Sequence, residues 1–338
     1  GWDIGGVHTK AVWLPGGDLD HSRSASRPFQ IWRAPEELPQ VLREVYAALK
    51  VRQVEAMAVT MTAELADAFP SKRQGVLFIL DALRRAFPDV PTYLLSLSGE
   101  MEALSAAFQR LADFAAANWL ASALFVAGQQ HEGLLVDVGS TTTDITPIVG
   151  GRVLAQGRSD TARLAAGELV YSGVVRTNPN TIVSRVPIGG RACRVAAEYF
   201  TVMGDVYLLL GLLPAQRYTS PTPDGRFCTM EDAQRRLARL VCADAETLAA
   251  GEILHLARYL HERQLQQLLE ALYQVLSRFP EEQLPLIPVG AGRFLAIEAG
   301  QRLGLLLSDL EIPPAATDVL PCLAVAYLLD QHLRRGRG

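Results

Sequence analysis

The sequence contains almost no lysine: Lys10, Lys50 and Lys72 are the only three among 32 basic residues, and 36 acidic residues give a net charge of −4. A surface that binds nucleic acid needs a broad excess of positive charge. The basic run at residues 334–337 is too short to supply it and is typical of a solvated chain end. We therefore expect no nucleic-acid partner.

Cysteine motifs and long apolar runs are also missing. The four cysteines lie far apart, without the Cys-x-x-Cys spacing of a zinc site or the density of a disulfide framework. The most apolar stretch, from Phe114 to Gly128, is shorter than a bilayer-spanning helix and includes Asn118. These absences favour a cytoplasmic protein that does not enter a membrane.

Hydrophobic periodicity predicts alternating strands and helices. Strand patterns occur at residues 2–14, with a break at Gly5-Gly6, and at 56–61, 91–96, 133–139, 145–149, 181–187 and 286–292. Helical spacing occurs at 36–49, 76–87, 111–127, 191–210, 230–241, 247–278, 293–303 and 319–335. Strands that alternate with helices indicate an α/β fold.

The opening pattern of strand, turn and strand is repeated from Gly133 to Gly151. Such an internal repeat indicates a second unit of the same kind. We expect a first domain at residues 1–130 and a second at 131–316, which includes a helical insertion at about 208–280. The helix at 317–338 is expected to pack back on the first domain.

Each predicted domain opens with an Asp-x-Gly hairpin. The first reads Asp3-Ile4-Gly5-Gly6 and the second Asp137-Val138-Gly139-Ser140. An aspartate that ends a buried strand beside a glycine turn places a carboxylate next to backbone N–H groups, which can bind phosphate oxygens while the carboxylate holds hydrated Mg²⁺. One such hairpin is an ordinary turn, and two structural hairpins without a ligand remain the alternative.

A third glycine loop lies near the end of the chain. Residues 288–293, Pro-Val-Gly-Ala-Gly-Arg, connect a predicted strand to a predicted helix. This position suits a nucleotide or another anionic ligand, because the N–H groups at the start of a helix attract negative charge. On its own, such a loop is as often structural.

The three loops, in this order and spacing, resemble the actin/Hsp70/sugar-kinase superfamily. This resemblance implies two actin-like (ribonuclease H-like) α/β domains with a cleft between them, and two phosphate loops that face each other across it. The third loop would hold adenosine in that superfamily. Here Ala291 separates the usual pair of glycines, so nucleotide binding stays open.

A narrower resemblance extends over nearly the whole chain. Four stretches carry it: residues 1–6 (GWDIGG), 60–70 (TMTAELADAFP), 117–121 (ANWLA) and 198–207, with Glu-Tyr-Phe and Gly-Asp-Val-Tyr. These are similar to the hydantoinase/oxoprolinase-like proteins linked to tetrahydromethanopterin C1 metabolism, although Ala63 stands where that family has glycine. The resemblance implies methanofuran or methylofuran biosynthesis, in which a furanylmethyl diphosphate is joined to the phenol oxygen of a tyramine or tyrosine derivative and diphosphate is released.

The resemblance and the residue types together give a set of candidate site residues. Asp3 and Asp137 are the candidate ligands of Mg²⁺, the one cofactor we expect. The candidate diphosphate-binding residues are Gly5, Gly6, His8, Lys10, Lys72, Gly139, Ser140, Thr141 and Thr142. The candidate substrate-binding residues are Asn118, Gly290, Gly292 and Arg293, and the candidate bases are Glu64, Asp67 and Asp144.

Several of these residues have an equally simple structural interpretation. Glu64 and Asp67 could cap the following helix, and Lys72 could be an exposed residue at its start. Asn118 could be a buried polar group bonded to backbone, and His8 could be a solvated residue at a hairpin tip. His255 and His261 lie on a polar helix and are expected at the surface. Arg191 and Arg194 could help to bind an anion, but ion pairing is the expected role.

Three hypotheses follow for the function. The first is the transferase that releases diphosphate from a furanylmethyl donor. The second is an ATP-dependent small-molecule kinase or ATPase of the actin-like superfamily, and the third is a regulatory or scaffold protein without turnover. Phosphate loops suit both enzymes, because both reactions neutralise a polyphosphate. Small-molecule substrates are the expected partners, and the sequence does not indicate an oligomeric state.

Overall fold

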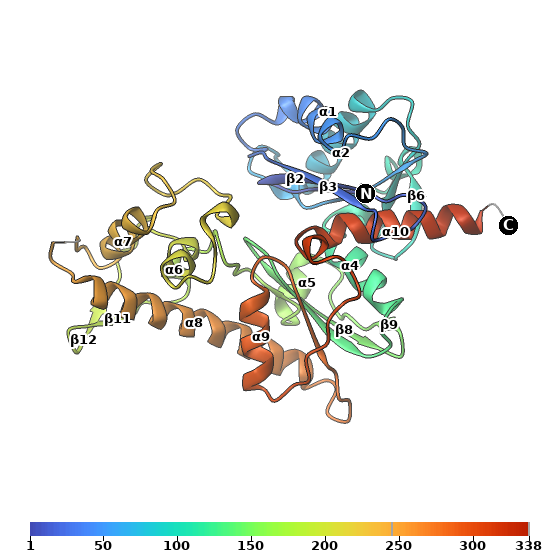
Figure 1. Ribbon diagram of the computed structural model, residues 1–338. Helices are drawn as coiled ribbons and strands as arrows, with labels where there is room; N and C mark the ends of the chain where they lie inside the picture. The colour runs from blue at the N-terminus through green and yellow to red at the C-terminus, as the bar shows by residue number, and fades with distance from the viewer. Residues whose placement is uncertain (245, 337–338) are drawn as a thin grey trace. The chain divides into compact units, whose positions relative to one another are not determined.

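The computed structural model describes residues 1–244 and 246–336 and divides the chain into two compact units (Figure 1). Unit 1 contains residues 1–132, 148–154 and 310–338, and unit 2 contains residues 133–147 and 155–309. These boundaries differ from the predicted ones, which follow residues 130 and 316. Residues 148–154 belong to unit 1, and the chain returns to that unit at residue 310 rather than at 317.

Unit 1 is built on a six-stranded sheet in the order β3-β2-β1-β4-β5-β6. Its strands are β1 (Trp2–Ile4), β2 (His8–Trp13), β3 (Arg23–Pro28), β4 (Met57–Met61), β5 (Thr92–Leu95) and β6 (Met101–Ala103). β1, β4 and β5 are parallel, and the other neighbours are antiparallel. Connections between parallel strands need a crossover, which the helices of this unit supply.

The helices of unit 1 are α1 (Leu38–Ala48), α2 (Lys72–Ala86), α3 (Leu104–Ala107), α4 (Asn118–Ala127) and α10 (Leu320–Arg335), with short 3₁₀ turns η1 (Pro35–Glu37), η2 (Ala63–Leu65), η3 (Leu111–Phe114) and η6 (Pro314–Val319). Figure 1 shows α1 and α2 on one side of the sheet and α10 on the other. The C-terminal helix packs on β1, β2, β4 and α4.

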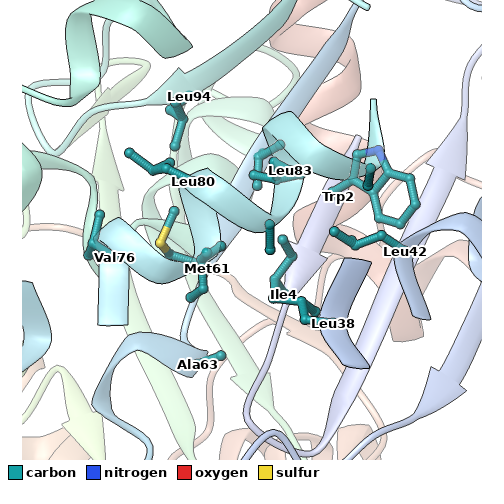
Figure 2. Close-up of a cluster of buried hydrophobic side chains, with 14 of the residues drawn as sticks. Trp2, Ile4, Leu38, Leu42, Met61, Ala63, Val76, Leu80, Leu83 and Leu94 are labelled. Carbon is teal, nitrogen blue, oxygen red and sulfur yellow. The ribbon is translucent and has the colours of Figure 1, made fainter. Parts of the chain in front are cut away.

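The core of unit 1 fills the space under α1 and α2. Trp2 and Ile4 from β1, Met61 from β4, and Leu42 from α1 are all at most 2% exposed, and Figure 2 shows them in one cluster with Leu80 of α2. Burial of such side chains contributes roughly 1.5–3 kcal/mol each. This packing fixes the carboxyl ends of β1 and β4, where the first hairpin begins.

Unit 2 carries the order β10-β8-β7-β13, in which β7 and β13 are parallel. Its strands are β7 (Gly133–Val138), β8 (Thr143–Val149), β10 (Leu169–Val170) and β13 (Leu286–Val289), with a separate hairpin of β11 (Arg185–Ile188) and β12 (Arg191–Arg194). The last two residues of β8, Ile148 and Val149, pair with β9 (Arg152–Val153). These residues of β8 and the whole of β9 belong to unit 1.

The helices of unit 2 are α5 (Asp160–Ala165), α6 (Met203–Leu209), α7 (Met230–Arg239), α8 (Ala250–Leu276) and α9 (Arg293–Arg302), with η4 (Pro179–Thr181) and η5 (Ala215–Arg217). The long helix α8 packs on α6, α7, α9, β10 and β11, and α9 packs on β7 and β13 (Figure 1). The range predicted as a helical insertion, about 208–280, contains α7 and α8.

Two predicted elements are wrong. The helix expected at 111–127 is divided into η3 and α4, because Ala116 takes a positive φ of 50° that no α-helix allows. The helix expected at 191–210 begins only at Met203, and Arg191–Arg194 form strand β12 instead. Gly189 and Gly190, with φ of 54° and 74°, turn the chain between β11 and β12, and a two-glycine turn of this kind favours a hairpin.

No helix in the described parts of the chain is both long and apolar enough to cross a membrane. The four cysteines, at positions 193, 228, 242 and 322, are all free thiols.

Candidate functional site

In the hairpin between β7 and β8 of unit 2, two carbonyl groups accept hydrogen bonds from a segment outside the hairpin. The N–H of Gly139 donates to the carbonyl oxygen of Thr142 at 2.8 Å and closes the turn. The Gly139 carbonyl accepts from the N–H of Val174 at 3.0 Å, and the Ser140 carbonyl accepts from Val175 at 3.1 Å and Arg176 at 2.9 Å. With these carbonyls bonded to residues 174–176, the N–H groups of the loop are left for other partners.

These N–H groups form the central feature of the site. Within residues 1–244 and 246–336, no hydrogen bond uses the N–H of Ser140, Thr141 or Thr142. The hydroxyls of Ser140 and Thr141 lie 3.4 Å apart, and all three residues are half-buried. Successive N–H groups with adjacent hydroxyls suit an anion such as phosphate. The use of this loop as a phosphate site stays a prediction.

Asp137 is the last residue but one of β7, beside this loop, and is in register with Val289 of the parallel strand β13. The next residue, Gly290, has a φ of 85°, and a Cβ there would collide with the Asp137 carboxylate and lie 2.6 Å from the Val138 carbonyl oxygen. Gly292 is packed as closely, since its Cβ would lie 2.5 Å from Val174, and its N–H donates to Val138 at 2.8 Å. The glycines therefore hold the third loop against the second hairpin.

Arg293, predicted to bind substrate, begins α9 directly after these glycines. Its Nε donates to the Pro288 carbonyl oxygen at 3.2 Å, and its Nη2 forms an ion pair with Asp309. Both partners belong to unit 2, so the guanidinium connects the ends of the α9 segment. This arrangement gives Arg293 a structural role.

Asp144, a candidate base, lies on β8 and is paired with a buried cation. Arg163, which is fully buried, donates through Nη2 to Asp144 Oδ1 at 3.1 Å and to the Glu168 carbonyl oxygen at 2.8 Å. Burial raises the pKa of Asp144, and the positive charge of Arg163 opposes that rise. The carboxylate is thus held in one orientation and protonates more easily than an exposed aspartate.

The first hairpin, in unit 1, repeats the construction of the second. The N–H of Gly5 donates to the His8 carbonyl oxygen at 2.9 Å, and the carbonyls of Gly6 and Val7 accept from Ile31 and Phe29. In the described part of the chain, the N–H groups of Gly6 and Val7 make no hydrogen bond. The two Asp-x-Gly segments therefore form hairpins with the same hydrogen-bond pattern, one in each unit.

Asp3 and Lys10 are cross-strand partners in the β1–β2 ladder. Lys10 Nζ donates to the Asp318 carbonyl oxygen, 3.0 Å away, just before α10. One of the three ammonium donors of Lys10 therefore holds the C-terminal segment of unit 1. Asp3 is half-buried at the end of β1, the position in its hairpin that Asp137 has in the other.

Glu64 and Asp67 follow β4 and differ sharply in burial. Glu64 lies in η2 and is 1% exposed, whereas Asp67 is exposed. Neither caps α2, because the Oγ of Ser71 accepts the N–H of Gln74 at 3.2 Å and is the N-cap. Lys72 is the first residue of that helix and is half-buried. The capping interpretation of the two carboxylates is therefore wrong.

Asn118 was predicted in the interior of a helix. It is instead the first residue of α4. It is half-buried, and its carbonyl oxygen accepts from the Ser122 hydroxyl at 3.4 Å. It belongs to unit 1, as do Asp3 and Glu64.

Sequence reasoning missed the segment that supports the second hairpin. Gly173 and Arg176 lie far from both motifs along the chain, yet Arg176 bonds the hairpin through its N–H and Gly173 lies against its backbone. A Cβ at Gly173 would lie 2.5 Å from the Ser140 carbonyl carbon. The only local signal was a glycine after the short strand β10.

One group of side chains in the described residues has the spacing of a metal site. His261, Glu262 and Glu298 offer ligand atoms within 4.8 Å of one another. Arg302 already pairs with Glu262 at 2.7 Å and with Glu298 at 2.9 Å. Because this guanidinium supplies the positive charge that a metal would bring, the group is an ion-pair cluster.

The fold places the chain in a known class of proteins. A nucleotide-free structure of acetone carboxylase, described as ATP-dependent, superposes with a TM-score of 0.52 at 12% identity, over 87% of this chain and 49% of that one. This likeness concerns the fold alone. The predicted class, an α/β chain with two actin-like units, is confirmed.

The family is narrower than the fold. The profile of the hydantoinase/oxoprolinase family matches residues 55–328, and the chain belongs to this family. A relative from Methanocaldococcus jannaschii is 31% identical over 334 residues, 98% of each chain, and is named (4-{4-[2-(γ-L-glutamylamino)ethyl]phenoxymethyl}furan-2-yl)methanamine synthase. A relative of the same name from Methanococcus vannielii is 30% identical over 46% of this chain and 70% of its own.

Proposed function

We propose that this chain is a transferase of methanofuran-type or methylofuran-type cofactor biosynthesis. It joins a furanylmethyl diphosphate to the phenol oxygen of a tyramine or tyrosine derivative and releases diphosphate. The observation that carries the proposal is the 31% identity, over 98% of both chains, with the synthase of Methanocaldococcus jannaschii. No comparable observation favours the kinase or ATPase.

The leaving group accounts for the chemistry of the second hairpin. When the bond between the furanylmethyl carbon and the diphosphate oxygen breaks, negative charge increases on the diphosphate, and the furan oxygen stabilises the carbon cation. The N–H groups of Ser140, Thr141 and Thr142, with two adjacent hydroxyls, suit that charge. Such preorganised donors typically contribute about 2.7–4 kcal/mol each to catalysis.

Mg²⁺ is part of the proposal. The Asp137 carboxylate offers oxygen atoms of the kind that Mg²⁺ prefers as ligands. The absence of a Cβ at Gly290 leaves room for the Asp137 carboxylate. Asp3 has the equivalent position in the hairpin of unit 1. The ion would supply positive charge to the diphosphate and require no proton transfer.

The acceptor phenol needs a base, because its ordinary pKa is about 10. We assign this role to Asp144, whose Oδ1 accepts a hydrogen bond from Arg163 and is held in place by it. The new ether bond forms between the phenol oxygen and the furanylmethyl carbon, and the phenol proton passes to this carboxylate. Asp67, which is exposed, suits this role least.

The setting of the reaction is also part of the proposal. The product suits a cofactor of tetrahydromethanopterin-linked C1 metabolism, and the four free thiols fit a reducing cytoplasm. The substrates are small molecules.

The decisive experiment supplies the protein and Mg²⁺ with an aminomethylfuran-methyl diphosphate and with tyramine, tyrosine or their γ-glutamyl derivatives. Ether product and diphosphate are measured, and ADP is measured in a parallel reaction with ATP. Ether product without ADP is the expected result, and ADP without ether would overturn the proposal. Asp137→Asn should abolish diphosphate release, whereas Asp309→Asn, an exposed carboxylate of the same unit, serves as the control.

A further inference from the structure

A buried amide on α8 connects three segments of unit 2. Gln264 is 2% exposed, and its Nε2 donates to the Ser172 hydroxyl at 2.8 Å and to the Gly173 carbonyl oxygen at 3.0 Å. Its Oε1 accepts from the Tyr207 hydroxyl of α6 at 2.6 Å. A buried amide with its donors and acceptor satisfied specifies one arrangement of its neighbours.

The segment that Gln264 holds is the one on which the phosphate loop rests. The Ser172 carbonyl oxygen accepts from Thr143 Oγ1 at 2.8 Å, and the Gly173 N–H donates to Thr177 Oγ1 at 2.7 Å. Gly173 lies so close to the loop that a Cβ would be 2.5 Å from the Thr141 nitrogen. A shift of residues 172–173 would therefore move the loop that carries the unused N–H groups.

Tyr207 decides which way the amide points. Its ring is fixed by edge contacts with Phe294, 4.9 Å between centroids, and with His261, 5.8 Å. Burial, together with the Glu298 carboxylate, raises the pKa of the Tyr207 hydroxyl well above its ordinary value, so the hydroxyl stays a donor. Because it donates to Oε1, the other end of the Gln264 amide must face the Ser172–Gly173 backbone.

We infer that Gln264 and Tyr207 are positioning residues of the phosphate loop: through Ser172 and Gly173 they set the geometry of residues 139–142. The loop's use as a diphosphate site rests on the proposed function, whereas the positioning itself does not. Neither residue carries out a chemical step. The inference also gives a role to the Gly-Asp-Val-Tyr stretch at 204–207, whose last residue is Tyr207.

Hydrogen exchange on the ligand-free protein tests the positioning directly. Gln264→Met keeps an unbranched side chain and removes both donor bonds, and Tyr207→Phe keeps the ring and removes one hydroxyl. The matched control is Gln274→Met on the same helix, where the amide donates to the Ala165 carbonyl oxygen at 2.8 Å. We expect exchange at the hydrogen-bonded amides of Gly139 and residues 173–176 to be about tenfold faster in Gln264→Met, and unchanged in the control.

The second measurement separates a positioning role from general stability. We expect the KM for the furanylmethyl diphosphate and the Kd for Mg²⁺-diphosphate to rise about tenfold in both test variants, with a smaller change in kcat. If Gln264→Met raises exchange throughout unit 2, the Tyr207→Phe variant decides. Exchange at Gly139 and residues 173–176 that keeps the wild-type rate in Tyr207→Phe overturns the inference. Failure of the wild-type protein to release diphosphate would instead overturn the proposed function, and the exchange data would still decide the positioning.

Discussion

The Asp137 carboxylate occupies the space that a side chain at residue 290 would need. A Cβ built on Gly290 collides with Oδ1 of Asp137 and lies 3.0 Å from the carbonyl carbon of Val138. Asp137 on β7 is in register with Val289 on the parallel strand β13. Gly290 follows Val289 directly and therefore lies beside the carboxylate. Glycine at position 290 is therefore required by the carboxylate as well as by its own φ of 85°.

Gly290→Ala should displace the Asp137 carboxylate and reduce kcat/KM for the furanylmethyl diphosphate by roughly 100-fold, the effect of a misplacement of about 1 Å. Gly304→Ala is the matched control, because Gly304 has a similar φ of 68° but open space around its Cα. Steady-state kinetics on both variants make the comparison. Equal losses of activity would attribute the effect to backbone strain and contradict the role of Asp137.

The parts of the site that the sequence predicted depend on short segments. A carboxylate and a glycine turn at the end of a strand are neighbours along the chain, so the hairpins at Asp3 and Asp137 could be recognised without coordinates. The support of the second hairpin could not, because Gln264 contacts Ser172 across 92 residues of sequence. Nothing local to either residue indicates this contact.

His261 shows a different limit of sequence reasoning. It was expected at the surface with His255, yet it is 8% exposed and lies 2.9 Å from Glu298 of α9. The reason is that α8 is covered by α6, α7 and α9, so more than one face of the helix is buried. Amphipathic periodicity identifies a single buried stripe and misses such positions.

Asp144→Asn should remove the acidic limb of the pH profile of kcat and reduce the plateau by at least about 100-fold. The base must be ionised, and burial raises the pKa of Asp144, so activity should rise with pH through that raised value. Asp160 contributes to the same rise by charge repulsion. Asp160→Asn should therefore move the limb to lower pH and preserve the plateau, and a limb that persists in Asp144→Asn would exclude this carboxylate as the base.

Arg236→Met should destabilise unit 2 by about 3–5 kcal/mol, because it leaves a buried carboxylate without its cation. Arg236 and Asp205 are both fully buried, with Nη2 2.6 Å from Oδ1. Arg239→Met, on the same helix, removes an exposed arginine 4.0 Å from Asp224 and should cost less than about 1 kcal/mol. Calorimetric unfolding of both variants tests the difference, and similar transition temperatures would show that the buried pair contributes no more than the exposed one.

Gly75→Ala should destabilise unit 1 although alanine is the better helix former. Gly75 lies inside α2, and a Cβ there would be 2.7 Å from the Glu64 Cα and 2.8 Å from its carbonyl carbon, both backbone atoms that no rotamer change can move away. The turn that holds Glu64 must therefore shift, at a cost of about 1–3 kcal/mol for overpacking.

Gly251→Ala, near the start of α8, makes the same substitution in open space and should be neutral or slightly stabilising. Thermal unfolding distinguishes the two, and a Gly75→Ala protein as stable as Gly251→Ala would show that the turn after β4 adapts freely. If the turn shifts as expected, Glu64 moves with it, so the same Gly75→Ala variant also measures how far the chemistry depends on the position of this buried carboxylate. An unchanged kcat in the destabilised protein would limit Glu64 to a structural role.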